Sequence, residues 1–260
     1  MRKMDNQDKK NISSSSWRNT TGSGRFGSRI FDFLKNSLFL QDIGVSIVSS
    51  VHPAIMHNLG KIEVLKKALW HCELENIEGS YFEFGVFQGT SILAAAKSFR
   101  TLKSKIKRRF YGFDAFDLGF KYFDERDKHP FFKEGDFSVS YDRVSRRLGK
   151  YKEVELIPGY FEHTLKEKRV LELRGHEKCA IIFIDCDLMN PALLALEFIK
   201  PMLQAGSVIV LDDYWAYKGD SSLGVAGALN SFLKNNQGIC LREFYRYGYG
   251  GTSFIVERVS

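Results

Sequence analysis

Three carboxylates are the residues of this sequence whose types and spacing most directly suggest chemistry. Asp185 ends one apolar run, and the adjacent pair Asp212 and Asp213 ends another. Both runs are typical of buried strands in a parallel sheet, so their carboxyl ends should meet at one edge. Like charges that lie close together either raise one another's pKa or recruit a cation, and an all-oxygen set favours Mg²⁺ or a similar divalent ion over zinc. We therefore expect a metal site on these three aspartates.

A divalent cation at that edge could hold the hydroxyls of a substrate and lower their pKa. The resulting alkoxide could then attack an electrophilic group held beside it, in line with the bond that breaks. Two alternatives stay open. Asp187 would replace Asp185 as the ligand if the strand ended two residues later, and Asp212 and Asp213 could simply cap a loop.

A glycine loop occupies the motif YFEFGVFQGTS, at 81–91, between a strand pattern and a helical pattern. Its glycines would let a ligand approach the backbone, although a tight turn explains them equally well. A dinucleotide site would need another glycine where this chain has Phe87, which argues against NAD or FAD. Glu83 suits an amino group, while Ser91 and the helix N-terminus suit a carboxylate, and S-adenosylmethionine carries both. The predicted cofactor residues here are Glu83, Gly85, Phe87, Gly89 and Ser91.

The next two strand ends supply groups for the rest of such a cofactor. Asp114 ends the motif YGFD at 111–114, where an acidic side chain suits the two hydroxyls of a ribose. The third strand leads into a turn in which Gly159 permits close approach, and Tyr160 or Phe161 could flank an adenine ring. We therefore expect Asp114, Gly159, Tyr160 and Phe161 to bind the cofactor as well.

An alternation of strands and helices must position these residues. Apolar runs with strand patterns are separated by segments long enough for helices, which predicts a doubly wound, mostly parallel seven-stranded α/β sheet. Asn190 and Pro191 are typical of an N-cap and a first helical residue, and a C-terminal β-hairpin closes the fold. The predicted strands lie at 80–85, 109–114, 154–158, 180–185, 207–212, 240–245 and 253–258. We divide the chain into a flexible polar arm (1–27), an N-terminal helical segment (28–78) and the cofactor-binding domain (79–260).

The composition is that of an ordinary globular chain, with 260 residues, 44% hydrophobic and 27% charged. No apolar run approaches the length of a membrane helix, so we expect a cytoplasmic protein without a membrane partner. The net charge is +7, but its densest basic stretch, at 103–109, also suits a helix C-terminus, so we do not expect a nucleic-acid partner. The four cysteines are scattered and indicate neither zinc nor disulfides.

These motifs together resemble the macrocin O-methyltransferase family, metal-dependent enzymes that methylate sugar hydroxyls on natural products. The likeness covers about 60–214 and rests on five motifs in order. They are GSYFEFGVFQG at 79–89, YGFDAF at 111–116, IPGYFEHTL at 157–165, IDCD at 184–187, and the segment from Gly206 to DDY at 212–214. The resemblance implies a class I fold that binds S-adenosylmethionine at the loop, Asp114 and the 159–161 turn. It also implies metal on Asp185, Asp212 and Asp213, with Asp185 contacting the cofactor and taking part in catalysis.

The resemblance leaves the general base open. Catechol O-methyltransferases, which look similar, use a lysine just past the first aspartate, and the corresponding residue here is Leu188. Histidine is the natural substitute, and His129 is our candidate because its segment, 121–136, would overhang the donor site. His163 is the alternative.

The resemblance also leaves the acceptor open, because the family usually has YEST where this chain has LMNP at 188–191. We expect a small-molecule or glycan hydroxyl as the acceptor, and the chain is consistent with a homo-oligomer. Two rival hypotheses are an RNA or protein methyltransferase, which the pI near 9.1 favours, and a non-catalytic binding protein of the same fold.

Overall fold

The computed structural model describes residues 37–122 and 133–260, and the chain divides into two compact units, 1–52 and 53–260. The described part of the first unit is helix α2 (Leu38–Ser50), which begins after Ser37; the Ser37 hydroxyl accepts a hydrogen bond from the Leu40 amide. None of its residues is buried. The division falls at a different place from the predicted boundary after residue 78, and the predicted arm at 1–27 lies outside the described residues.

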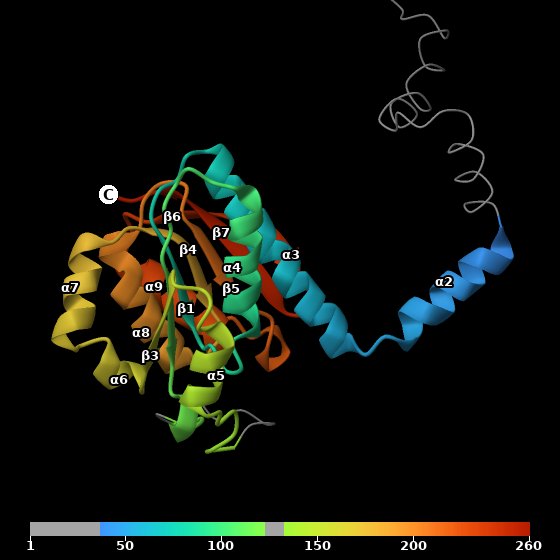
Figure 1. The fold of residues 1–260 in the computed structure, drawn as a ribbon, viewed down its shortest axis with the longest axis horizontal. Coiled ribbons are helices and arrows are strands. Elements are labelled where there is room, and N and C mark those ends of the chain that lie inside the picture. Colours follow the sequence, from blue (N-terminus) through green and yellow to red (C-terminus); the bar gives the residue numbers. More distant parts are fainter. Residues whose placement is uncertain (1–36, 123–132) are drawn as a thin grey trace, which may run out of the picture. The chain divides into compact units, whose positions relative to one another are not determined.

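The second unit is built on one seven-stranded sheet with the order β3-β2-β1-β4-β5-β7-β6 (Figure 1). Strands β1 to β5 are parallel, and β7 pairs antiparallel with both β5 and β6. The predicted doubly wound, mostly parallel sheet with a closing hairpin is therefore confirmed. The strands are β1 (Ser80–Phe84), β2 (Phe110–Asp114), β3 (Val154–Pro158), β4 (Cys179–Ile184), β5 (Val208–Leu211), β6 (Cys240–Tyr247) and β7 (Gly251–Arg258).

Helices cover both faces of the sheet (Figure 1). The α-helices of this unit are α3 (Pro53–Leu74), α4 (Thr90–Leu102), α5 (Tyr141–Leu148), α6 (Phe161–Thr164), α7 (Lys168–His176), α8 (Met189–Ile199) and α9 (Gly224–Asn235). One apolar core lies under α6 to α9, and a second lies under α3, α4 and α5. Short 3₁₀ turns occupy Phe116–Leu118, Lys200–Met202 and Tyr217–Gly219.

Helix α8 begins earlier than predicted. Its N-cap is Leu188, with Asn190 and Pro191 inside the first turn, whereas the sequence pattern predicted Asn190 as the cap. A proline is tolerated there because the first four amides of a helix have no partner within it.

Strands β1 and β4 are buried along their whole lengths because each has a helical layer on both faces. Alternate residues therefore enter different cores: Phe82 and Phe84 pack under α8, while Tyr81 packs under α3 and α4. The order of the strands reverses between β1 and β4, and ligands bind beyond the carboxyl ends of strands at such a reversal. Within the described residues, no single helix is long and apolar enough to cross a membrane.

Candidate functional site

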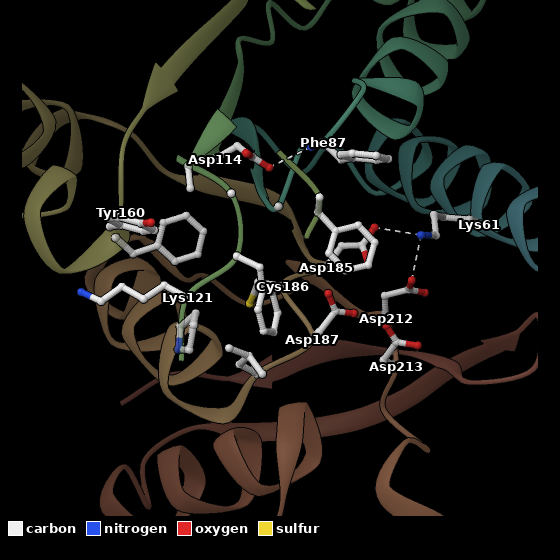
Figure 2. A pocket seen from close by; sticks show the side chains of 18 of the residues that line it. Lys61, Phe87, Asp114, Lys121, Tyr160, Asp185, Cys186, Asp187, Asp212 and Asp213 are labelled. Carbon is white, nitrogen blue, oxygen red and sulfur yellow. Dashed lines mark hydrogen bonds and ion pairs between the residues drawn. The ribbon is translucent and has the colours of Figure 1, made fainter. Parts of the chain in front are cut away.

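A cavity of about 420 Å³ opens beyond the carboxyl ends of β1, β2, β4 and β5 (Figure 2). This is the size range of small-molecule sites, which are a few hundred cubic ångströms. The first turns of α3, the end of the β6–β7 hairpin, the turn after β3 and the segments around Phe120 and Phe137 form its other walls. Its lining includes Ala54, His57, Asn58, Lys61, Gly85, Phe87, Asp114, Phe120, Lys121, Phe137, Gly159, Tyr160, Phe161, Asp185, Cys186, Asp187, Leu188, Asp212, Asp213 and Tyr249.

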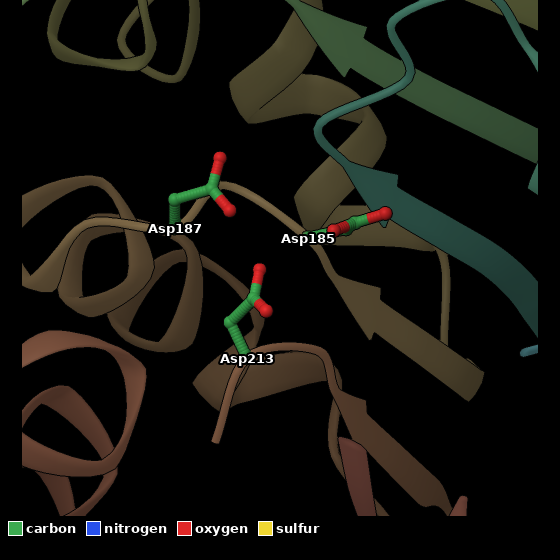
Figure 3. A group of neighbouring side chains, drawn as sticks. All are labelled: Asp185, Asp187 and Asp213. Carbon is green, nitrogen blue, oxygen red and sulfur yellow. The ribbon is translucent and has the colours of Figure 1, made fainter. Parts of the chain in front are cut away.

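Three aspartates form an acidic cluster on one wall of this cavity: Asp185, Asp187 and Asp213 (Figure 3). One carboxylate oxygen from each lies within 4.8 Å of the others, so the three could ligate one ion. Burial, and then Asp213, raise the pKa of Asp187 well above its usual range. A purely carboxylate set that is costly to ionise without a counter-charge fits a hard divalent cation such as Mg²⁺.

Asp212, the third predicted metal ligand, lies beside this cluster in the same cavity and contacts other side chains. Its carboxylate accepts a hydrogen bond from the Tyr247 hydroxyl at 2.7 Å, lies 2.7 Å from the Lys61 ammonium, and lies 3.1 Å from Nε2 of His57. These partners occupy most of the lone pairs a metal would need. Burial alone would raise the pKa of Asp212, but the His57 hydrogen bond and the Lys61 charge outweigh it and hold that pKa below its usual value.

Lys61 lies between the acidic cluster and Asp212 and forms an ion pair with each. Its ammonium lies 2.8 Å from Asp185 and 2.7 Å from Asp212, and Figure 2 shows it between them. Burial lowers the pKa of Lys61, yet the two carboxylates raise it by more, so Lys61 is a permanent internal cation.

Asp114 fixes the backbone of the glycine loop by accepting hydrogen bonds from its amides. One of its oxygens accepts hydrogen bonds from the amides of Val86 and Phe87, at 2.7 and 2.8 Å, and the other accepts from Phe116 at 2.6 Å. A carboxylate has about four acceptor sites, so roughly one remains for a ligand such as a ribose hydroxyl. Gly85 and Phe87 line the cavity beside it, as predicted.

The other predicted residues of the loop do not line the cavity. Glu83 is fully buried and accepts hydrogen bonds from the Tyr81 hydroxyl and, at 2.6 Å, from the Ser91 hydroxyl. Burial raises the pKa of Glu83 to about 7. Gly89 is the N-cap of α4 and packs against Val144 of α5. Glu83, Gly89 and Ser91 thus support the loop from inside the fold.

The turn after β3 lines the cavity with all three predicted residues, Gly159, Tyr160 and Phe161. The Tyr160 hydroxyl donates a hydrogen bond to the carbonyl of Leu118 at 3.2 Å, and the Lys121 ammonium lies 5.2 Å from the centre of its ring. This aromatic side of the cavity lies opposite the acidic cluster, as Figure 2 shows for Tyr160.

Of the two histidines predicted as a general base, the structure describes only His163. His129 lies outside the described residues. The His163 side chain is 76% exposed, lies 3.8 Å from Glu162 and does not line the cavity.

The sequence interpretation left His57 open between packing and substrate contact, and it missed Lys61 on α3 and Tyr249 in the hairpin turn. His57 and Lys61 are four residues apart, so a helix places them on one face, and this spacing was a signal that could have indicated them. Tyr249, whose ring centre lies 4.2 Å from that of His57, carried no such signal.

Comparisons with known proteins agree with this geometry. The model of the macrocin-O-methyltransferase family matches residues 53–239, while a search of curated proteins finds no significant match. The calicheamicin methyltransferase CalS11 is 19% identical, covers 88% of this chain and 90% of its own, and has a TM-score of 0.62. The O-methyltransferase NovP is 18% identical, with 77% and 80% coverage and a TM-score of 0.58. An apo structure of CalS11, described as a TDP-rhamnose 3'-O-methyltransferase, is 20% identical, with 88% and 92% coverage and a TM-score of 0.54. At these identities the likeness shows the shared fold.

Proposed function

Because this chain belongs to the macrocin-O-methyltransferase family and is therefore an S-adenosylmethionine-dependent O-methyltransferase, we propose that it methylates a hydroxyl of a sugar or another polyol. The acceptor would be a natural product or a glycan, and a divalent cation would assist the reaction. The observation that carries this proposal is the acidic cluster, which faces the same cavity as the glycine loop. A methyl donor and a polar acceptor could therefore meet there.

The side of the cavity formed by Gly85, Phe87 and Asp114 suits the donor. Asp114 has about one acceptor site left for a ribose hydroxyl, and Gly85 brings the backbone close without a side chain in the way. Tyr160 and Phe161 offer aromatic surface for the adenine ring.

The acidic side suits the acceptor. Asp185, Asp187 and Asp213 would hold the cation, which when bound supplies a Lewis acid that lowers the pKa of an acceptor hydroxyl. Lys61 orients Asp185 by its ion pair, and Asp212 in turn holds Lys61. His129 remains our predicted proton acceptor.

Mass spectrometry of a panel of glycosides and glycans, incubated with S-adenosylmethionine and Mg²⁺, tests the proposed function by the gain of one CH₂ group. We expect a product that disappears when a chelator is added. A protein that binds neither S-adenosylmethionine nor Mg²⁺ in calorimetry would instead support a non-catalytic role for the fold.

Asp213→Asn tests the acidic cluster. The substitution removes one charged ligand but keeps the size of the side chain, so Mg²⁺ affinity and kcat should fall by about tenfold to a hundredfold, while the Kd for S-adenosylmethionine changes little. Asp142→Asn, at an exposed carboxylate of α5, is the matched control. Equal loss of donor binding and turnover in Asp213→Asn would contradict the assignment.

A further inference from the structure

Within the second unit, helix α3 carries a stripe of exposed side chains along one face, formed by Met56, Leu59, Glu63, Lys66, Trp70 and Leu74. Intervals of three and four residues place all six on one face of the helix. Its four apolar members are 45 to 60% exposed, which is unusual for large side chains in one line. The opposite face, with Val64, Leu65 and Leu69, is buried against the sheet. The stripe is therefore apolar at both ends and charged in the middle.

The stripe is complementary to itself when two copies of α3 run antiparallel. In one register Met56 meets Leu74 of a second copy. In the same register Leu59 meets Trp70, so each apolar end covers the other. Glu63 then meets Lys66 at the centre, and the two-fold axis repeats every contact. Within the stripe itself, each charged residue thus meets one of opposite sign.

The neighbours of the central charges are compatible with this pairing. Glu63 also lies 2.8 Å from Lys67 in its own helix, while the Lys67 ammonium stacks over the Tyr245 ring. Lys66 is exposed and makes no ion pair within 37–122 and 133–260. A second copy would supply Lys66 with a carboxylate and would bring a third charge to the Glu63–Lys67 pair.

Among the described residues, helix α2 is another segment that could cover this stripe, but a second copy of α3 matches the stripe better in length and charge. At 13 residues it is about 20 Å long, against about 33 Å for the 22 residues of α3, and only two residues connect the helices. Folded back, it would leave Trp70 and Leu74 uncovered. Its one charged residue is Asp42, which would face Glu63 with the same sign or leave Lys66 unmatched.

We propose that this protein forms a two-fold symmetric dimer through antiparallel packing of the outer stripe of α3. The inference does not depend on the reaction. It does connect the interface to the site, since the first turns of α3 also carry His57, Asn58 and Lys61 in the wall of the cavity. Dimerisation would hold these turns in place.

Charge exchange at the centre of the stripe tests the register. Glu63→Lys places like charges opposite each other twice per dimer, and Lys66→Glu does the same with the other sign. In sedimentation experiments over a concentration series, each full-length variant should dissociate at least about tenfold more readily than the wild type. An equimolar mixture of the two variants, or the double variant E63K/K66E, should recover the dimer.

Glu172→Lys is the control, because Glu172 forms a comparable exposed pair with Lys168 on α7, away from the stripe. Circular dichroism would show that each variant is folded. A wild-type protein that is monomeric at every concentration would overturn the proposal. So would single variants that remain dimeric, which would place the contact elsewhere, on α2 for example, or a mixture that stays dissociated.

Discussion

Glu83 is a carboxylate that the fold keeps away from water and joins to two hydroxyls, those of Tyr81 and Ser91. Burial raises its pKa from an ordinary 4.5 to about 7. Between these two pH values the folded protein binds a proton at Glu83 that the unfolded chain has lost. The free energy of unfolding therefore falls as the pH rises through this window, and the loss is complete above it.

Glu83→Gln should remove that dependence, because an amide does not ionise. Relative to the wild type, the variant should gain about 3 kcal/mol of unfolding free energy as the pH rises from about 4.5 to about 8. Urea denaturation at several pH values in this range measures the difference, with the exposed Glu78→Gln as control. Parallel pH profiles for wild type and Glu83→Gln would show that Glu83 titrates normally.

The positions of the acidic residues could be predicted from the sequence, but the directions of their side chains could not. The apolar runs correctly placed Asp185 and the Asp212–Asp213 pair at the ends of neighbouring strands. Beyond the end of β5 the regular alternation of side chains stops, so the sequence alone does not tell which way each of the two adjacent aspartates points. Asp213 turns into the acidic cluster through a left-handed backbone (φ 49°), and Asp187 joins it with φ 59°. Such local turns leave no regular pattern in a sequence.

The βα turn after β1 depends on one glycine. Gly85 has φ +95°, and a Cβ added there would lie 1.8 Å from the carbonyl oxygen of Asp185. The glycine therefore lets the ends of β1 and β4 approach closely enough to share the cavity.

Gly85→Ala should destabilise the protein by about 3 kcal/mol or more, because the methyl group must displace the backbone that carries Asp185. Gly219→Ala is a matched control, since Gly219 also has a left-handed φ, +77°, but has open space around it. Thermal or urea unfolding of both variants gives the contribution of the clash alone. Similar stability losses in the two variants would mean that strain in φ, and not the contact with Asp185, accounts for the effect.

Helix α3 illustrates why elements can be predicted more easily than their contacts. The sequence predicted a helical segment at 28–78, and the structure has helix α3 within it at Pro53–Leu74. Its contribution to the site, through His57 and Lys61, depends on how the helix packs over β4 and β5, which lie more than a hundred residues later in the chain. Periodicity reports which face of a helix is buried but does not report what lies beneath that face.

At the scale of the whole molecule, the sheet and the position of its cavity could be predicted because parallel strands all end at one edge. The central strands β4 and β5 were readable as almost wholly apolar runs, and the βα turns were readable from a glycine or an aspartate. The hairpin turn that brings Tyr249 to the cavity and Tyr247 to Asp212 could not be predicted, since antiparallel pairing of β7 with β5 carries no local signature.

The cavity wall carries five aspartates and two lysines among the described residues, so its formal charge stays negative even with the proposed divalent cation bound. S-adenosylmethionine brings a positive sulfonium into these surroundings, and methyl transfer converts it into an uncharged thioether. The reaction therefore weakens the Coulomb attraction that helped the donor to bind. We predict that the spent cofactor binds several-fold more weakly than S-adenosylmethionine, and that added salt narrows the difference. Calorimetry of both compounds at low and high salt measures this, and equal affinities at low salt would contradict it. The carboxylates attract the thioether less than the sulfonium, so the spent cofactor should leave readily. The same carboxylates then attract the next molecule of S-adenosylmethionine.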